Sequence, residues 1–87
     1  MKKIWFEEAW NDYLYWQVQD KKTLKRINQL IKDIEKNHPI GIGKPEQLKG
    51  DLSDFWSRRI DDRNRLVYRI IDEEILEIVS CRGHYNF

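Results

Sequence analysis

The 87-residue sequence predicts a single α+β domain in which two N-terminal helices pack on a small, mainly antiparallel sheet. Two observations carry this prediction. Apolar residues repeat at helical spacing between residues 21 and 37, and three segments after residue 54 alternate apolar with polar residues. These segments are joined by four and three residues, and such short connections require antiparallel neighbours. The expected order is strand, helix, helix and three strands, all within one domain of residues 1–87.

The N-terminal part is expected to hold a strand at Lys3–Phe6 and a helix at about 7–18. The strand is a short apolar and aromatic run. Two glutamates follow it, where carboxylates interact favourably with the positive end of a helix dipole. Trp10, Tyr13 and Leu14 then fall on one face of the helix.

The clearest periodic segment predicts a second helix at about 21–37. Its apolar stripe follows spacings of three and four residues and consists of Leu24, Ile27, Leu30, Ile31 and Ile34. The opposite face is mainly basic and carries Lys25, Arg26, Lys32, Asp33 and Lys36. Two interpretations of this face are open, because it is either a solvated surface or a surface that binds RNA.

Residues 38–45 contain both prolines and two of the four glycines, so a loop is expected to follow the helix. We interpret His38 as a surface histidine of this loop. Residues 41–44, Gly-Ile-Gly-Lys, lack the first glycine of a phosphate-binding loop and the serine or threonine after its lysine. They do not predict nucleotide binding.

Three strands are predicted at Phe55–Ile60, Arg65–Ile71 and Ile75–Cys81. In the middle strand one face holds Leu66, Tyr68 and Ile70, and the other holds Arg65, Val67 and Arg69. The helices are therefore expected to cover the apolar face and the arginines to stand on the open one. The sequence leaves open whether Arg58 or Arg59 joins them, because that depends on the register of the hairpin.

Composition excludes several classes of protein. A single cysteine, Cys81, rules out an intramolecular disulfide and gives too few soft ligands for a zinc site. Its apolar neighbours predict a small buried residue near a strand end. The N-terminus does not resemble a signal peptide, and no apolar run approaches the roughly 20 residues that span a bilayer. We expect a soluble, cytosolic protein that does not bind membranes.

Arginine is concentrated in the C-terminal third, where six of the seven arginines lie at or after Arg58, although the net charge is only +1. The planar guanidinium matches phosphate oxygens in pairs. Glu46 precedes these arginines, and His84 and Tyr85 follow them. A carboxylate, arginines, a histidine and a tyrosine are the side chains that metal-free cleavage of a phosphodiester requires, so no cofactor is expected.

Five segments, in the same order along the chain, carry a resemblance to a known family: IWFEEAWNDYLYWQ, KRINQLIKDI, GKPEQLK, FWSRRIDDRNRLVYRI and CRGHY. The sequence resembles the YoeB proteins, which are toxins of bacterial toxin–antitoxin modules within the RelE superfamily. The resemblance implies a RelE/YoeB-like fold related to microbial ribonucleases, often as a homodimer. It also implies an endoribonuclease that cleaves mRNA in the A site of the 70S ribosome and is silenced by a YefM-type antitoxin.

The resemblance also implies the site residues. The catalytic set is Glu46, Arg65, His84 and Tyr85, with Lys49 and Arg59 touching the RNA backbone. The chain departs from the family pattern in having Gly83 before His84 and two residues after Tyr85.

The expected chemistry assigns one role to each of these residues. Glu46 is the general base in a partly dry pocket, Arg65 stabilises the phosphorane and His84 is the general acid. Tyr85 stacks on a base or donates its hydroxyl to the phosphate. The alternative is a superfamily member without nuclease activity, which blocks the ribosome or inhibits gyrase.

Overall fold

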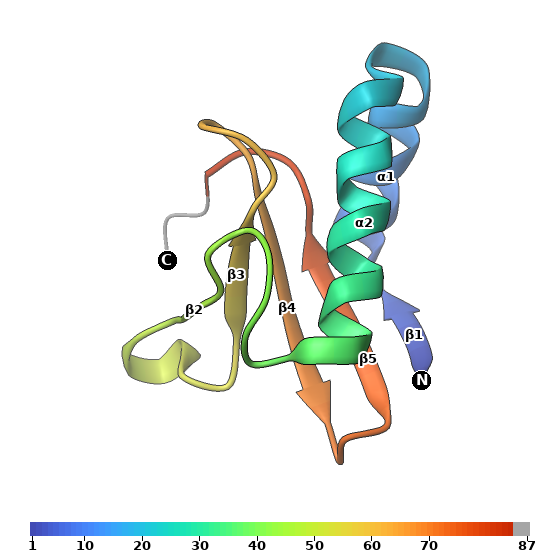
Figure 1. Cartoon of the computed structure of the whole chain (residues 1–87). Helices are drawn as coiled ribbons and strands as arrows, with labels where there is room; N and C mark the ends of the chain where they lie inside the picture. Colours follow the sequence, from blue (N-terminus) through green and yellow to red (C-terminus); the bar gives the residue numbers. More distant parts are fainter. Residues whose placement is uncertain (85–87) are drawn as a thin grey trace.

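The computed structural model describes residues 1–84, and it confirms the predicted α+β architecture (Figure 1). The elements are β1 (Lys2–Trp5), α1 (Glu7–Gln19), α2 (Lys21–Asn37), β2 (Glu46–Gln47), the short 3-10 helix η1 (Gly50–Leu52), β3 (Trp56–Arg59), β4 (Arg65–Ile71) and β5 (Ile75–Ser80). The strands form one sheet in the order β1-β5-β4-β3-β2. The prediction missed β2 and η1, and its other boundaries differ by at most one residue.

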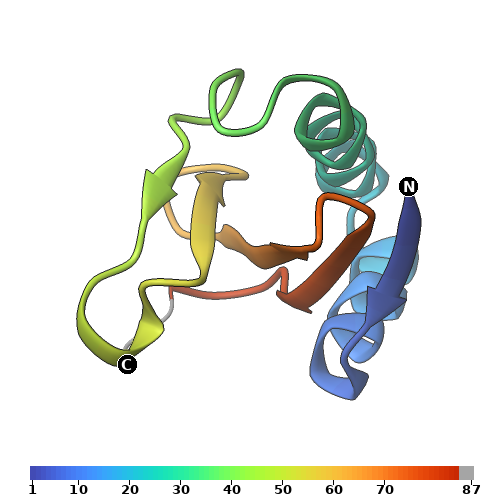
Figure 2. The ribbon, with the colours of Figure 1, turned by 90° about the horizontal axis from the view of Figure 1, so that it is seen from below.

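The sheet is mainly antiparallel, as predicted, with one parallel pair of strands. β1 pairs with β5 in parallel, whereas β2, β3, β4 and β5 pair with their neighbours in antiparallel fashion. In the sequence, both helices come between β1 and β2. These two strands form opposite edges of the sheet, and β2 is the edge farthest from the helices (Figure 2). In the part of the chain that the structure describes, no helix is long and apolar enough to cross a membrane.

The two helices are separated by one residue, Asp20, which ends α1 and caps α2. Its carboxylate accepts hydrogen bonds from the backbone amides of Lys22 and Thr23 at 3.1 and 3.3 Å. The Thr23 hydroxyl also donates to it at 2.8 Å, and these bonds lower the pKa of Asp20. A side-chain cap of this kind satisfies amides that have no partner within the helix.

The core lies between α2 and one face of the sheet. Four of the five residues in the predicted apolar stripe of α2 are buried, whereas Leu24 is only partly buried. The buried residues pack with strand residues in one cluster that includes Ile27, Leu30, Ile34, Leu66, Tyr68, Leu76 and Ile78. Cys81 joins this cluster, fully buried, as its neighbours predicted. Burial raises the pKa of its thiol to about 12.

One arginine lies on the core side of the sheet rather than on the open face. Arg58 is fully buried and pairs with Asp33 of α2. It also donates to the carbonyl oxygens of Ile40 and Ile42 at 2.9 and 3.1 Å and to the hydroxyl of Tyr68 at 3.3 Å. The guanidinium therefore ties α2, the loop after it and the sheet together. The register that the sequence left open thus places Arg59, and not Arg58, on the open face with Arg65.

The prediction for His38 needs correction. His38 is not a surface histidine, because it is half-buried and its Nδ1 lies 3.0 Å from the hydroxyl of Tyr68, with its ring edge against Trp56. Burial, and then the charge of Arg58, lower the pKa of His38. The apolar face of α1 is also only partly covered, since Trp10 and Leu14 are 45% and 40% exposed.

Candidate active site

The register of three strands brings the predicted site residues onto one face of the sheet. Glu46 of β2 is opposite Ser57 of β3, and Arg59 of β3 is opposite Arg65 of β4. Residues opposite each other in a ladder share a face, and so do residues two apart along a strand. Because Arg58 points into the core, Glu46, Arg59 and Arg65 stand on the face away from the helices.

These residues surround a hollow of about 220 Å³ at the β2–β3–β4 end of the sheet. Its lining consists of Lys44, Glu46, Ser57, Arg59, Arg65 and His84. Three cations, one carboxylate and one imidazole therefore meet around a space bounded on one side by the C-terminal segment. A set of this composition attracts a phosphate and offers groups that accept and donate protons beside it.

Arg65 is held in place by the turn between β3 and β4. It is only 9% exposed, and its guanidinium donates to the carbonyl oxygens of Asp61 and Asn64 at 2.7 and 3.1 Å. Within the described chain it forms no ion pair with a carboxylate. The positive charge is thus fixed in position and is not neutralised, as the binding of an anionic group requires.

The turn itself is built by Asp61. Its Oδ1 accepts hydrogen bonds from the amides of Arg63 and Asn64 at 2.8 and 2.7 Å, and the Asn64 amide group donates to both carboxylate oxygens. Partial burial acts to raise the pKa of Asp61, but these hydrogen bonds outweigh it and the pKa is lowered. An aspartate that bonds the backbone two residues on is typical of a tight turn. Although both side chains belong to this turn, Asp61 and Arg65 form no salt bridge.

The loop after α2 brings Lys44 to the site. The carbonyl oxygen of Gly43 accepts from the amide of Arg59 at 2.7 Å, which joins this loop to the end of β3. Gly43 has a φ of +80°, and a Cβ there would lie 2.7 Å from a methyl group of Leu30, so only glycine fits. The sequence prediction did not include Lys44 or Ser57. Lys44 lies two residues before Glu46, but its backbone is left-handed, with a φ of +51°, so no alternating pattern marks it in the sequence.

The C-terminal segment is fastened to the same turn through Gly83. The amide of Gly83 donates to Oδ1 of Asn64 at 2.7 Å, and its carbonyl oxygen accepts from the amide of Arg65 at 3.1 Å. Gly83 has a φ of +82°, which favours glycine. Gly83, the residue directly before His84, is therefore hydrogen-bonded to the backbone of Arg65.

Helix α1 holds the start of this segment from the other side. The amide of Cys81 donates to Asp12 at 3.0 Å, and its carbonyl oxygen accepts from the indole of Trp16 at 2.8 Å. The guanidinium of Arg82 lies 3.4 Å from the centre of the Tyr15 ring. Burial raises the pKa of Asp12. Residues 81–83 are thus bonded to α1 and to the β3–β4 turn, which fixes the approach of the chain to His84.

Not every predicted residue meets in the hollow. Lys49 is exposed and does not line it, and Tyr85 lies outside the described residues. Glu46 is exposed, so the partly dry pocket expected around its carboxylate is not present. Within residues 1–84, no group of three or more His, Cys, Asp and Glu side chains is arranged to hold a metal ion.

Comparison with known proteins identifies the same family over nearly the whole chain. Residues 5–85 match the model of the YoeB-like toxin of bacterial type II toxin–antitoxin systems. Toxin YoeB of Escherichia coli K12 is 56% identical over 85 residues, which is 98% of this chain and 100% of the relative. A YoeB dimer and a heterotetrameric YoeB–YefM complex, both from Staphylococcus aureus, are each 44% identical over 98% of both chains, with TM-scores of 0.90 and 0.89.

Proposed function

This chain belongs to the YoeB-like toxins of bacterial type II toxin–antitoxin systems, and we propose that it is an endoribonuclease that cleaves mRNA in the ribosomal A site. The observation that carries the proposal is the hollow in which Glu46, Arg59, Arg65 and His84 meet. Activity on the ribosome gives the toxin a cytoplasmic site of action.

The nucleophile in this reaction is the 2′-hydroxyl of the RNA itself. Glu46 removes the hydroxyl proton as general base, and the oxygen attacks the adjacent phosphate. A carboxylate in water is a weak base at neutral pH, with an ordinary pKa of about 4.3. Glu46 is exposed in the chain alone. Bound RNA would cover the carboxylate and exclude water, which raises the pKa of a carboxyl group and makes it a stronger base.

Arg65 stabilises the negative charge that develops on the phosphate in the transition state. Its guanidinium is already oriented by two carbonyl oxygens, so little reorganisation is needed when the charge forms. Arg59 stands directly opposite it and, with Lys44, holds the neighbouring phosphates of the strand. Lys49 is a more distant contact to the RNA backbone.

His84 protonates the 5′-oxygen as the leaving group departs. A histidine suits this role because its ordinary pKa of about 6.5 leaves a protonated fraction near neutral pH. The products are a 2′,3′-cyclic phosphate, or the 3′-phosphate formed by its hydrolysis, and a 5′-hydroxyl. Tyr85 completes the proposed set as the residue on which a base stacks. The nucleophile comes from the RNA and the protons pass through side chains, so the reaction as proposed uses no metal.

Two protein partners follow from the relatives. The YoeB of Staphylococcus aureus forms a dimer and a complex with YefM, and we assign this chain a homodimer and a YefM-type antitoxin. An acidic, partly disordered antitoxin segment that folds over Arg59 and Arg65 would neutralise the site. Hydrogen exchange tests this position, because protection restricted to the outer faces of the helices would contradict it.

The experiment that tests the proposed activity is mapping of mRNA 5′ ends on ribosomes after brief expression of the toxin. New 5′-hydroxyl ends at a fixed offset in the A-site codon are expected, and they should be absent for His84→Ala. Growth arrest without such ends in either protein would contradict the chemistry. A simple block of the A site, or changed plasmid supercoiling caused by gyrase inhibition, would then account for toxicity.

A further inference from the structure

Helix α2 carries a concentration of positive charge that the proposed cleavage does not use. Residues 21–37 hold six basic and two acidic residues, while the remainder of the chain holds more acids than bases. Both acids are occupied, because Asp33 pairs with Arg58 and Glu35 with Lys3. Within the described chain, the six cations of α2 form no ion pair: Lys21, Lys22, Lys25, Arg26, Lys32 and Lys36.

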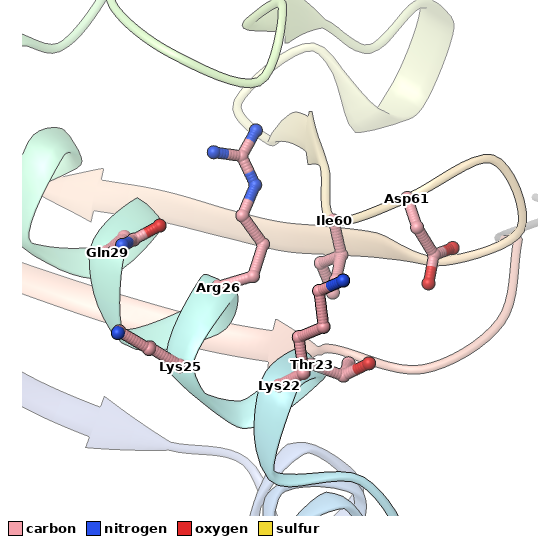
Figure 3. Close-up of a pocket in the computed structure, with 7 residues that line it drawn as sticks. All are labelled: Lys22, Thr23, Lys25, Arg26, Gln29, Ile60 and Asp61. Carbon is pink, nitrogen blue, oxygen red and sulfur yellow. The ribbon is translucent and has the colours of Figure 1, made fainter.

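Three of these six cations line a hollow of about 550 Å³. Lys22, Lys25 and Arg26 line it from α2, and Ile60 and Asp61 line it from the end of β3 and the following turn. Figure 3 shows Lys22 and Arg26 extending from the helix toward the side that carries Ile60. With Lys32 and Lys36, these cations extend over about 21 Å, at a rise of about 1.5 Å per residue.

We propose that this basic face of α2 is a second RNA-binding surface, and that it binds the phosphate backbone of ribosomal RNA while mRNA occupies the active site. Regularly placed cations complement the regular charge of a polynucleotide. A protein partner fits less well, because interfaces between proteins are depleted of lysine and built around apolar anchors. None of the large apolar residues that are exposed in the described chain lies on α2.

The position of the helix favours ribosomal over messenger RNA. α2 covers the face of the sheet opposite to the one that holds Arg59 and Arg65, so a strand being cleaved and a strand on α2 lie on different sides of the protein (Figure 1). Ribosomes consist largely of RNA, so a toxin that acts in the A site as proposed would meet ribosomal RNA on the side that does not hold the mRNA. The choice of ribosomal RNA as the ligand of this surface rests on the proposed function in the A site.

The test measures toxin binding to ribosomes programmed with an mRNA whose A-site codon has 2′-deoxy nucleotides, which removes the nucleophile and prevents cleavage. Affinity is measured over a series of salt concentrations. Replacing Lys22 and Lys25 by glutamine should weaken binding about tenfold or more and reduce the salt slope by about two, because each lost phosphate contact reduces it by about one. Lys2→Gln is the matched control, since Lys2 is exposed on β1, and it should change neither quantity.

An unchanged affinity and slope in the double variant would overturn the proposal. So would a loss of antitoxin affinity with ribosome binding intact, since α2 would then be a protein-binding surface. Cleavage of ordinary mRNA at saturating toxin separates the proposed RNA-binding surface from the proposed nuclease activity. The double variant should cleave at the parent rate under this condition. If the parent does not cleave but its salt slope depends on Lys22 and Lys25, the surface is established and the proposed nuclease activity fails.

Discussion

Arg59 and Arg65 lie directly opposite each other in the antiparallel pairing of β3 with β4. Like charges in this position destabilise a sheet. The carbonyl oxygens of Asp61 and Asn64 bind the Arg65 guanidinium, but they leave its charge in place, and Arg59 is exposed to water. Two cations fixed on one face, with Glu46 and His84 around the same hollow, are explained by a ligand that brings negative charge.

Replacing Arg65 by alanine should reduce cleavage on the ribosome by about 10²–10³-fold, because a preorganised charge donor contributes about this much to a rate. The measurement is single-turnover cleavage of mRNA with toxin in excess. Arg65→Lys keeps the charge but loses the planar guanidinium, whose Nη1 donates to two carbonyl oxygens, so an intermediate rate is expected. Full toxicity of Arg65→Ala with unchanged kinetics would exclude the assigned role.

Adjacent arginines should respond in opposite ways to the same substitution. Arg58→Ala removes a buried cation and leaves its partners unpaired, so it should lower the free energy of unfolding by about 3–5 kcal/mol. Arg59→Ala removes an exposed side chain and should change stability by less than about 0.5 kcal/mol while weakening ribosome-dependent cleavage. Denaturant unfolding and cleavage assays on both variants check this. Equal losses of stability would show that the two side chains do not lie on different faces.

These two arginines also show where sequence-based prediction reaches its limit. The helix at 21–37 and the strand Arg65–Ile71 were predictable because burial imposes a period on their side chains. Arg58 and Arg59 are the same residue type, and only the pairing of β3 with β4 decides which is buried. That pairing depends on the geometry of the turn built by Asp61, which periodicity does not record.

The site was predictable in part for a similar reason. Glu46, Arg59, Arg65 and His84 were nominated by residue type and by resemblance, and the fold brings these four around one hollow. β2 has only two residues, which is too short for an alternating pattern, so its pairing with β3 is decided by tertiary contacts. Lys44 was therefore missed, and Lys49, three residues after Glu46, was nominated although it lies outside the lining.

The buried environment of His38 should make stability depend on pH. Its pKa is lowered in the folded protein, so between that value and about 6.5 the unfolded chain binds more protons than the folded one. The contribution of His38 is complete above about pH 6.5 and is lost as the pH falls below it. His38→Gln keeps a group that can bond the Tyr68 hydroxyl, and its melting temperature should fall less between pH 7 and pH 5. Parallel curves for the two proteins would contradict this.

Gly41 and Gly50 both have positive φ, but their surroundings differ. A Cβ at Gly50 meets nothing within 4 Å, so Gly50→Ala should cost only the backbone strain, about 1 kcal/mol. At Gly41 a Cβ would lie 1.9 Å from Oδ2 of Asp33 and 2.9 Å from the Arg58 guanidinium. Gly41→Ala should therefore be more destabilising by at least about 2 kcal/mol, since it displaces a buried ion pair. Thermal unfolding of the two variants tests the difference, and similar values would show that the loop relaxes freely.

A row of apolar side chains at intervals of four residues predicts the surface of the proposed homodimer. Phe6, Trp10, Leu14 and Val18 are 37%, 45%, 40% and 81% exposed, and together they form a patch along α1. Contiguous exposed apolar surface on this scale marks an interaction site. Because Val18 is the most exposed, Val18→Glu should leave the fold intact and shift the protein from dimer to monomer in sedimentation. Gln19→Glu adds the same charge at an exposed position about 100° around the helix from Val18 and should leave the dimer unchanged. A dimer that tolerates Val18→Glu would place the interface elsewhere.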